Sequence, residues 1–159
     1  MSEGSGTRDL VELTRRSVEA ASRRDIDGTL APFSLDGVWD MSRLGMAVFE
    51  GHEAIRSFFE DWIGAYEDYE IALEQVHDFG GGVTFQVALQ RGRPADSAGF
   101  VELRYASVAT WADGLIERST QYTDIDEARA AGEKLAEQRK VSDGAREPET
   151  PSPASDSNR

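Results

Sequence analysis

The sequence contains no cysteine, has a deficit of positive charge and lacks any long apolar run. The absence of cysteine excludes disulfides, thiolate nucleophiles and sulfur-ligated metals together. Acidic residues outnumber Lys and Arg by 30 to 17, and the formal net charge of -13 repels nucleic-acid phosphates and anionic lipid. No apolar run approaches the roughly 18 residues that a spanning helix needs. We therefore expect no nucleic-acid or membrane partner, which leaves small molecules or another protein.

The two ends of the chain differ in composition from its middle. The start, "MSEGSGTRDL", has neither a basic region nor an apolar run, so we expect no secretory signal and a cytoplasmic location. The last stretch, "VSDGAREPETPSPASDSNR", combines Pro, Ser, Gly and charge with almost nothing apolar, which is typical of disorder. We predict one domain over residues 7–140, between a flexible start at 1–6 and a disordered tail at 141–159.

The first half of the domain shows helical periodicity. An amphipathic helix is predicted from an N-cap at Thr7 to about Arg24, and "DIDGTLAPF" predicts a second, short helix. The strongest pattern lies between His52 and Tyr66, where apolar residues recur at i, i+3, i+4, i+7, i+8 and i+11. These residues are Ile55, Phe58, Phe59, Trp62, Ile63 and Tyr66. We expect this helix to lie across an apolar surface.

After the third helix the period changes from 3.6 to 2, which indicates strands. A strand in "DGVWDMSRLG" precedes that helix, and four more are predicted in "YEIALEQVHDF", "VTFQVALQ", "FVELRYASVATW" and "LIERSTQYTDI". The segment "DEARAAGEKLAEQRK" predicts a final polar helix. The predicted fold class is α+β, with a curved, mostly antiparallel sheet wrapped around three helices as a cone with one open end.

Four segments carry a resemblance to a known family. They are "RRDIDGTLAPF", "DGVWDMSRLG", "FEGHEAIRSFFEDW" and "SVATWADGLIERSTQYTDIDEA". Together they resemble the SnoaL-like branch of the nuclear transport factor 2-like superfamily, over residues 9–132. The resemblance implies a pocket inside the cone, and a homodimer formed across the outer face of the sheet. The superfamily includes cyclases, isomerases, epoxide hydrolases, dehydratases and binding modules, so the fold alone does not name the reaction.

The reactions of similar proteins can be compared with the residues of this chain. Ketosteroid isomerases place a carboxylate base within one residue of Asp40, but their oxyanion donors correspond to Ser17 and a position near Ser107. The water-activating group of limonene-epoxide hydrolases corresponds to positions near Val87, Leu89 and Gln121, which cannot take a proton from water at neutral pH. The usual cyclase base also falls close to Gln121. A steroid-type isomerase, an epoxide hydrolase and an aldol cyclase using that base are all disfavoured.

The sequence contains no pattern of residues typical of a metal or cofactor site. His52 and His77 are the only histidines and lie on different predicted elements, with no third ligand at a helical spacing. We predict neither a metal nor another cofactor.

Asp40 has two interpretations that the sequence leaves open. As a partly desolvated carboxylate beside Trp39 and Met41, it would have a raised pKa and could act as a catalytic base. Strict alternation, however, places Asp40 opposite these two neighbours, where it would face water or pair with Arg43. A bulge at the end of the strand would turn it inward.

The other candidate residues are Tyr105 and His77, as proton donors, and a set of residues that would contact the substrate. The predicted substrate contacts are Trp39, Met41, Arg43, Phe59, Trp62, Ser107, Gln121 and Tyr122. Gln121 and Tyr122 have opposite parity, so only one of them can point inward. Tyr105, His77 and Trp62 are also compatible with a purely structural place in the core, and Arg43 with a surface ion pair.

Three functions are consistent with this sequence. The first is proton-transfer chemistry on a small apolar or aromatic molecule by an isomerase, cyclase or dehydratase, with Asp40 as base. The second is a non-catalytic module that holds a hydrophobic ligand or a partner chain. The third, a structural dimerisation unit, requires the interior to be filled by Phe33, Phe58 and Trp62.

Overall fold

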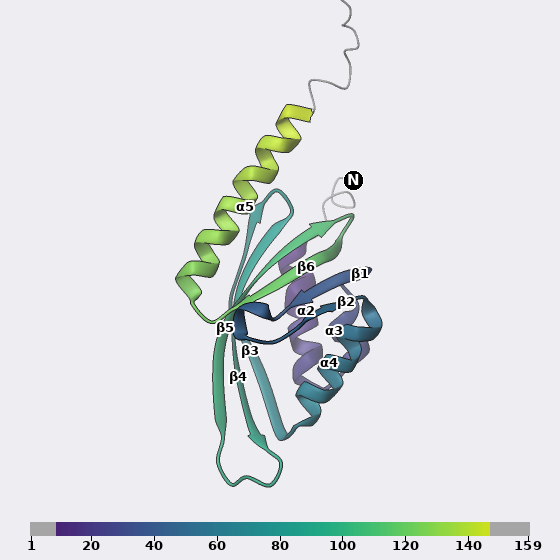
Figure 1. The fold of residues 1–159 in the computed structure, drawn as a ribbon, viewed down its shortest axis with the longest axis vertical. Coiled ribbons are helices and arrows are strands. Elements are labelled where there is room, and N and C mark those ends of the chain that lie inside the picture. Colours follow the sequence, from purple (N-terminus) through teal and green to yellow (C-terminus); the bar gives the residue numbers. More distant parts are fainter. Residues whose placement is uncertain (1–8, 147–159) are drawn as a thin grey trace, which may run out of the picture.

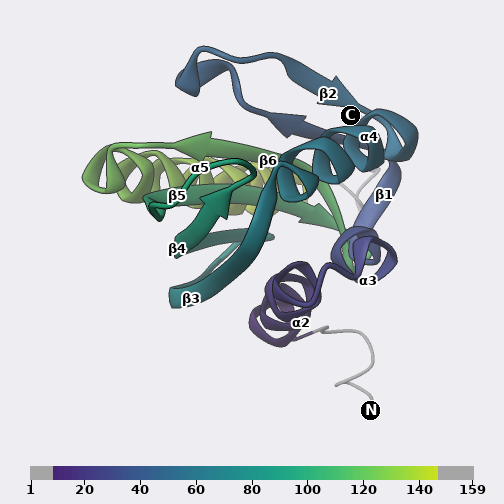
Figure 2. The same ribbon diagram turned by 90° about the horizontal axis from the view of Figure 1, so that it is seen from below.

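The sheet has six strands in the order β2-β1-β6-β5-β4-β3, and helices cover both of its faces (Figure 1, Figure 2). The computed structural model describes residues 9–146. Its strands are β1 (Phe33–Asp40), β2 (Val48–Glu50), β3 (Tyr66–Gly80), β4 (Val83–Pro94), β5 (Val101–Ala112) and β6 (Leu115–Tyr122). Its helices are α2 (Leu10–Ser22), α3 (Ile26–Leu30), the 3-10 turn η1 (Ser42–Leu44), α4 (His52–Gly64) and α5 (Ile125–Arg146). Strands β1 and β6 pair in parallel, and the other neighbours are antiparallel. The predicted fold class is confirmed.

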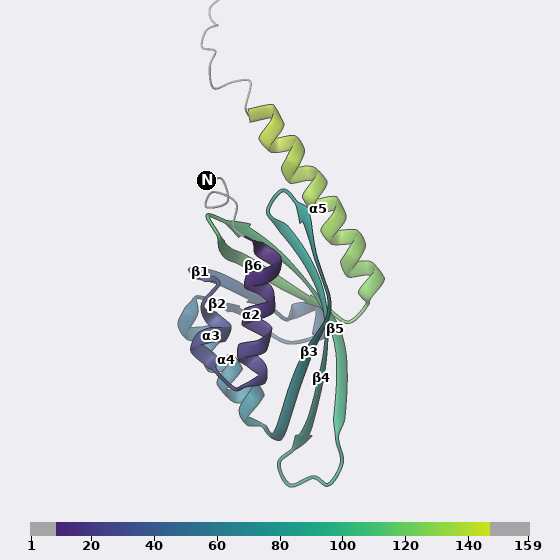
Figure 3. The same cartoon turned by 180° about the vertical axis from the view of Figure 1, so that it is seen from behind.

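Helices α2, α3 and α4 pack on the concave face of the sheet, as Figure 3 shows from behind. Helix α2 begins two residues later than predicted, because the carboxylate of Asp9 provides the N-cap by accepting the amide of Glu12 at 3.1 Å. Thr7 lies outside the described residues. The periodic apolar face of α4 is buried against β1, with Ile55 fully buried and Phe58 and Phe59 beside the indole of Trp39.

The long strand β3 contains a bulge that determines which of its side chains face the concave side. Leu73 pairs with Ala88 of β4, whereas the next paired residue is Gln75, opposite Val87. Glu74 is the extra residue, so the regular alternation is interrupted there. Side chains before the bulge, such as Ile71 and Leu73, therefore contact the inner core, while Gln75 and His77 lie on the opposite face.

Helix α5 packs on the outer face, against β3, β4, β5 and β6 (Figure 1). It covers a second core formed by Val83, Phe85, Val87, Ala106 and Val108. The helix runs to Arg146, so the predicted boundary at residue 140 ends it too early. The remainder of the predicted tail, 147–159, and the predicted loose start, 1–6, lie outside the described residues. None of the helices within 9–146 is long and apolar enough to cross a membrane.

Candidate functional site

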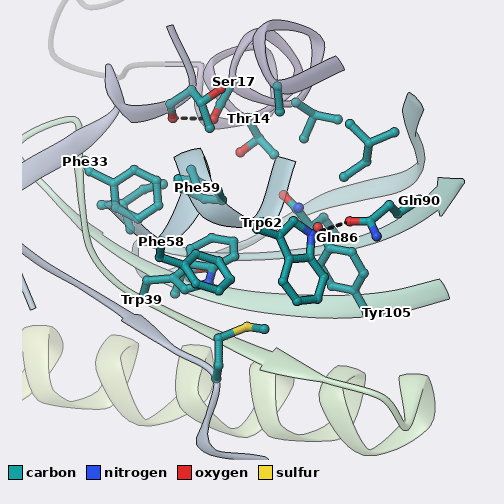
Figure 4. A pocket seen from close by; sticks show the side chains of 18 of the residues that line it. Thr14, Ser17, Phe33, Trp39, Phe58, Phe59, Trp62, Gln86, Gln90 and Tyr105 are labelled. Atoms are coloured by element: carbon teal, nitrogen blue, oxygen red, sulfur yellow. Dashed lines mark hydrogen bonds between the residues drawn. The ribbon is translucent and has the colours of Figure 1, made fainter. Parts of the chain in front are cut away.

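A pocket lies between the concave face of the sheet and the helices α2 and α4 (Figure 4). Its volume, counted as the space open to the centres of water-sized spheres, is about 70 Å³. Aromatic and apolar side chains form most of its wall: Phe33, Trp39, Met41, Phe58, Phe59 and Trp62. These side chains line the space and do not fill it. The interior therefore differs from the filled core that a structural dimerisation unit would require.

No charged side chain lines the pocket, among the residues that the structure describes. Its ionisable groups are the phenols of Tyr69 and Tyr105. Burial raises the pKa of Tyr105 to about 12. Burial, followed by the neighbouring phenols of Tyr105 and Tyr66, also raises the pKa of Tyr69. Both phenols are therefore neutral at physiological pH and serve as hydrogen-bond donors, not as bases.

A hydrogen-bonded network around Gln90 fixes one end of the pocket. The side-chain oxygen of Gln90 accepts the indole N–H of Trp62 at 2.6 Å and the hydroxyl of Tyr69 at 3.2 Å. Its amide nitrogen donates to the hydroxyl of Tyr66 at 3.3 Å. Gln90 is 2% exposed, and its hydrogen bonds join α4 to β3 and β4.

The structure places Asp40 outside the pocket. Asp40 follows the alternation of β1: its neighbours Trp39 and Met41 face the pocket, and it lies on the opposite side. Its carboxylate accepts the amide and hydroxyl of Ser42, at 2.9 and 2.6 Å, and pairs with Arg118 at 2.5 Å. Burial works to raise the pKa of Asp40, but these hydrogen bonds and the charge of Arg118 together lower it. A depressed pKa and the wrong side of the sheet make the prediction of Asp40 as the pocket base wrong.

Three other candidates also lie away from the pocket. The pattern predicts His77 on the inner face, but the bulge at Glu74 places its ring on the outer face, in a cluster with the rings of Phe79 and Phe85. Arg43 pairs with Glu127 of α5 and lies over the ring of Tyr122 on that same face. His77, Arg43 and Tyr122 therefore cannot contact a molecule inside the pocket.

Ser107 and Gln121 face the inner side but do not line the pocket. Both are buried, and the hydroxyl of Ser107 donates to the side-chain oxygen of Gln121. The amide of Gln121 donates in turn to the carbonyl and hydroxyl of Ser119. Because their polar groups are bonded to each other and to Ser119, Ser107 and Gln121 stabilise the sheet next to the pocket. Of the predicted residues, Trp39, Met41, Phe59, Trp62 and Tyr105 line the pocket; that they bind a ligand stays a prediction.

Several lining residues were missed because the polar side of β4 faces inward. The alternation of Val83, Phe85 and Val87 marks an apolar side, which belongs to the core under α5. The opposite side, with Gln86 and Gln90, contributes to the pocket. Thr14 of α2 was also missed, although it lies four residues after Leu10 on the predicted apolar face. In the sequence, such residues can be recognised as polar side chains at positions of a helix or strand that the pattern predicts to be buried.

The comparisons with known proteins agree with this geometry. The profile of the SnoaL-like domain matches residues 14–119. No curated protein sequence matches the chain significantly.

Several solved structures share the fold. An NTF2-like protein of unknown function from Burkholderia pseudomallei is 21% identical, with a TM-score of 0.63 over 76% of this chain and 95% of that one. TerC, co-crystallised with polyporic acid, is 18% identical, with a TM-score of 0.64 over 79% and 98%. An LEH-like epoxide hydrolase from M. tuberculosis is 15% identical, with a TM-score of 0.60 over 77% and 84%. Because these identities are low, the likeness extends to the fold alone.

Proposed function

We propose, from the premise that this chain belongs to the SnoaL-like domain family, that its pocket binds an uncharged, flat, mainly apolar small molecule. The observation that carries the proposal is the lining, which combines aromatic side chains in mutual edge-on and tilted contact with no charged group among the described residues. An apolar concave site with a few polar groups is the usual form of a small-molecule site. A charged ligand would lose its hydration there without gaining a counter-charge.

Binding without chemical conversion fits this pocket better than proton transfer does. An isomerase, cyclase or dehydratase needs a group that accepts a proton, and Asp40 is held on the other face by Ser42 and Arg118. The hydroxyls of Tyr69 and Tyr105 can donate hydrogen bonds, but their raised pKa values keep them from acting as acceptors of a proton.

Catalysis is the second candidate, and the neutral phenol of Tyr105 in the pocket wall favours it. Such a donor can stabilise negative charge that develops on a substrate oxygen. In this case the base must come from the substrate or from water. Relatives of this fold include a protein described as an epoxide hydrolase as well as proteins of unknown function.

Calorimetric titration with two naphthalenes of similar size tests the proposed function. We expect neutral 2-acetylnaphthalene to bind at pH 7 and the 2-naphthoate anion to bind at least about a hundredfold more weakly, because its carboxylate is desolvated without a partner. The Leu103→Trp variant puts a larger side chain into the pocket wall and should lose the binding of 2-acetylnaphthalene, since Leu103 lines the pocket. Equal binding of the two probes would contradict the proposal, as would binding unaffected by Leu103→Trp.

A further inference from the structure

The polar groups around the pocket fall into two sets. In the first set each group has a partner: the hydroxyl of Ser17 donates to the carbonyl of Thr29 at 2.8 Å, and that of Thr29 donates to the carbonyl of Asp25 at 2.8 Å. Thr84 accepts the indole N–H of Trp111 at 2.9 Å. These groups, like those around Gln90, are used by the fold itself and stabilise the walls.

The second set has no hydrogen-bond partner within residues 9–146. It comprises the hydroxyl of Thr14, the side-chain amide of Gln86 and the hydroxyl of Tyr105, all in the pocket lining. Thr14 is the clearest case, because it is only 5% exposed and still forms no side-chain hydrogen bond. The indole N–H of Trp39, in the same lining, is also buried without a partner. Of the four, only the indole nitrogen of Trp39 is fully buried without a partner among the described residues. The polar atoms of Thr14, Gln86 and Tyr105 keep accessible surface in the pocket wall, so a molecule in the pocket can reach them.

The register places these groups where they can act together. Tyr105 pairs with Ala88, and Gln86 pairs with Ser107, so Gln86 and Tyr105 are diagonal neighbours on the same face of β4 and β5. Diagonal neighbours lie within reach of long side chains. Thr14 projects from α2 toward this part of the sheet across the pocket (Figure 4). Helix α2 on one side of the pocket and the sheet on the other therefore both present polar groups to a bound molecule.

The chemistry of these groups defines what they can recognise. The hydroxyls of Thr14 and Tyr105 and the amide nitrogen of Gln86 each offer an O–H or N–H donor to a molecule in the pocket, whereas the indole nitrogen of Trp39 is enclosed by the protein. A hydrocarbon ligand would leave these donors without water and without a partner, which is costly. A carboxylate or phosphate would satisfy them but would lack a counter-charge.

We propose that the ligand carries an uncharged oxygen acceptor, namely the carbonyl of a ketone, quinone or ester, and that Thr14, Gln86 and Tyr105 determine specificity for it. This inference rests on the proposed function, because it concerns the same pocket. It adds that the unpartnered donors select among neutral molecules of one shape. The partnered set around the pocket takes no part in this selection.

A matched pair of probes tests the inference. 2-Acetylnaphthalene and 2-ethylnaphthalene have nearly the same shape and differ by the carbonyl oxygen. We expect the protein to bind the acetyl compound about tenfold more tightly in calorimetric titration, since one or two net hydrogen bonds distinguish the two probes. The Thr14→Val and Gln86→Met variants should each reduce this ratio to about threefold or less.

Thr29→Val is the matched control, because it removes a hydroxyl that also borders the pocket but is already bonded to Asp25. It should keep the preference for the acetyl compound. Thermal unfolding without ligand gives an independent measurement. Thr14→Val should leave the melting temperature unchanged or raise it, because no protein hydrogen bond is lost, whereas Thr29→Val should lower it.

The possible outcomes separate the two proposals. Tight binding of both naphthalenes with equal affinity would overturn the carbonyl inference and leave the proposed function standing. A ratio unchanged in Thr14→Val and Gln86→Met would also overturn it. If neither naphthalene binds the protein, the proposed function fails and this inference fails with it. A tenfold ratio that falls in both variants and survives in Thr29→Val supports it.

Discussion

Asp40 shows how a single residue can be buried, charged and still structural. Three donors hold its carboxylate on the outer side of β1, two from Ser42 and one from Arg118. This arrangement ties the end of β1 to β6 and to the turn η1. Its pKa is lowered, so the ionised form stabilises the fold.

Replacing Asp40 by Asn should destabilise the protein at neutral pH and not in acid. The folded carboxyl has a pKa below the usual 3.8, so its contribution is present above that value and is lost as the pH falls below it. We expect Asp40→Asn to reduce the free energy of unfolding by about 1 to 2 kcal/mol at pH 7. Urea unfolding at pH 7 and near pH 3 measures this, and an equal loss at both would contradict the role of the charge.

Tyr105 should show the opposite dependence at alkaline pH. Its pKa is raised from 10.0 to about 12, so the unfolded chain ionises first and stability is lost as the pH rises through that interval. Between pH 10 and 12 this one group contributes a slope of about 1 kcal/mol per pH unit. The Tyr105→Phe variant should lack this part of the slope in urea unfolding. A slope identical to that of the unaltered protein would argue that Tyr105 is solvated.

At the scale of the elements, α5 secures the hairpin between β3 and β4. Gly80, Gly81 and Gly82 all have positive φ, a backbone conformation that glycine adopts without steric cost. The guanidinium of Arg139 donates to the carbonyl of Gly81 at 2.7 Å and to that of Trp111 at 3.0 Å. One side chain of α5 thus links the β3–β4 hairpin to the end of β5.

Replacing Arg139 by Met should loosen this hairpin. We expect a loss of about 1 to 2 kcal/mol in the free energy of unfolding, because two backbone carbonyls lose a charged donor. Amide exchange at Trp111, whose N–H donates to the carbonyl of Gly82 at 2.8 Å, should become faster. Lys134→Met is the control, since Lys134 is exposed on the same helix and its replacement removes the same charge. Equal effects of the two substitutions would assign the loss to net charge alone.

The elements also show which parts of the structure were accessible to sequence reasoning. The 3.6 and 2 periods correctly gave α4 and the four consecutive strands β3 to β6, because apolar residues recur on at least one side of each. The same reasoning failed for His77, since a bulge changes parity without any mark in the pattern. It also failed for Gln86, because a sheet buried on both sides reverses the usual meaning of its polar face. The short strand β2 was not predicted.

For the molecule as a whole, the separation of charge from the pocket is the feature with the widest consequences. The chain has a net charge of -13, yet the pocket lining contains no charged side chain among the described residues. Helix α5 covers much of the outer sheet face, where the resemblance places a dimer contact, and the homodimer stays a prediction. Charge therefore acts on solubility and on encounters, and not on the bound state.

Binding of a neutral probe should consequently be nearly independent of salt. We expect the Kd of 2-acetylnaphthalene to change by less than about twofold between about 20 mM and about 500 mM NaCl, because no ion pair forms on binding. Calorimetric titration in both buffers gives the comparison. A fall in affinity of about tenfold or more at high salt would show that a charged group contacts the probe.

The extra residue in β3 has a consequence for the hollow beneath the sheet. A bulge bends and twists its strand, and Glu74 occupies this position in the middle of the pairing between β3 and β4. The concavity in which an organic molecule can sit thus depends on how many residues the strand contains, and not only on which ones. A deletion of this one codon would keep every lining side chain and yet flatten the wall, altering which shapes fit.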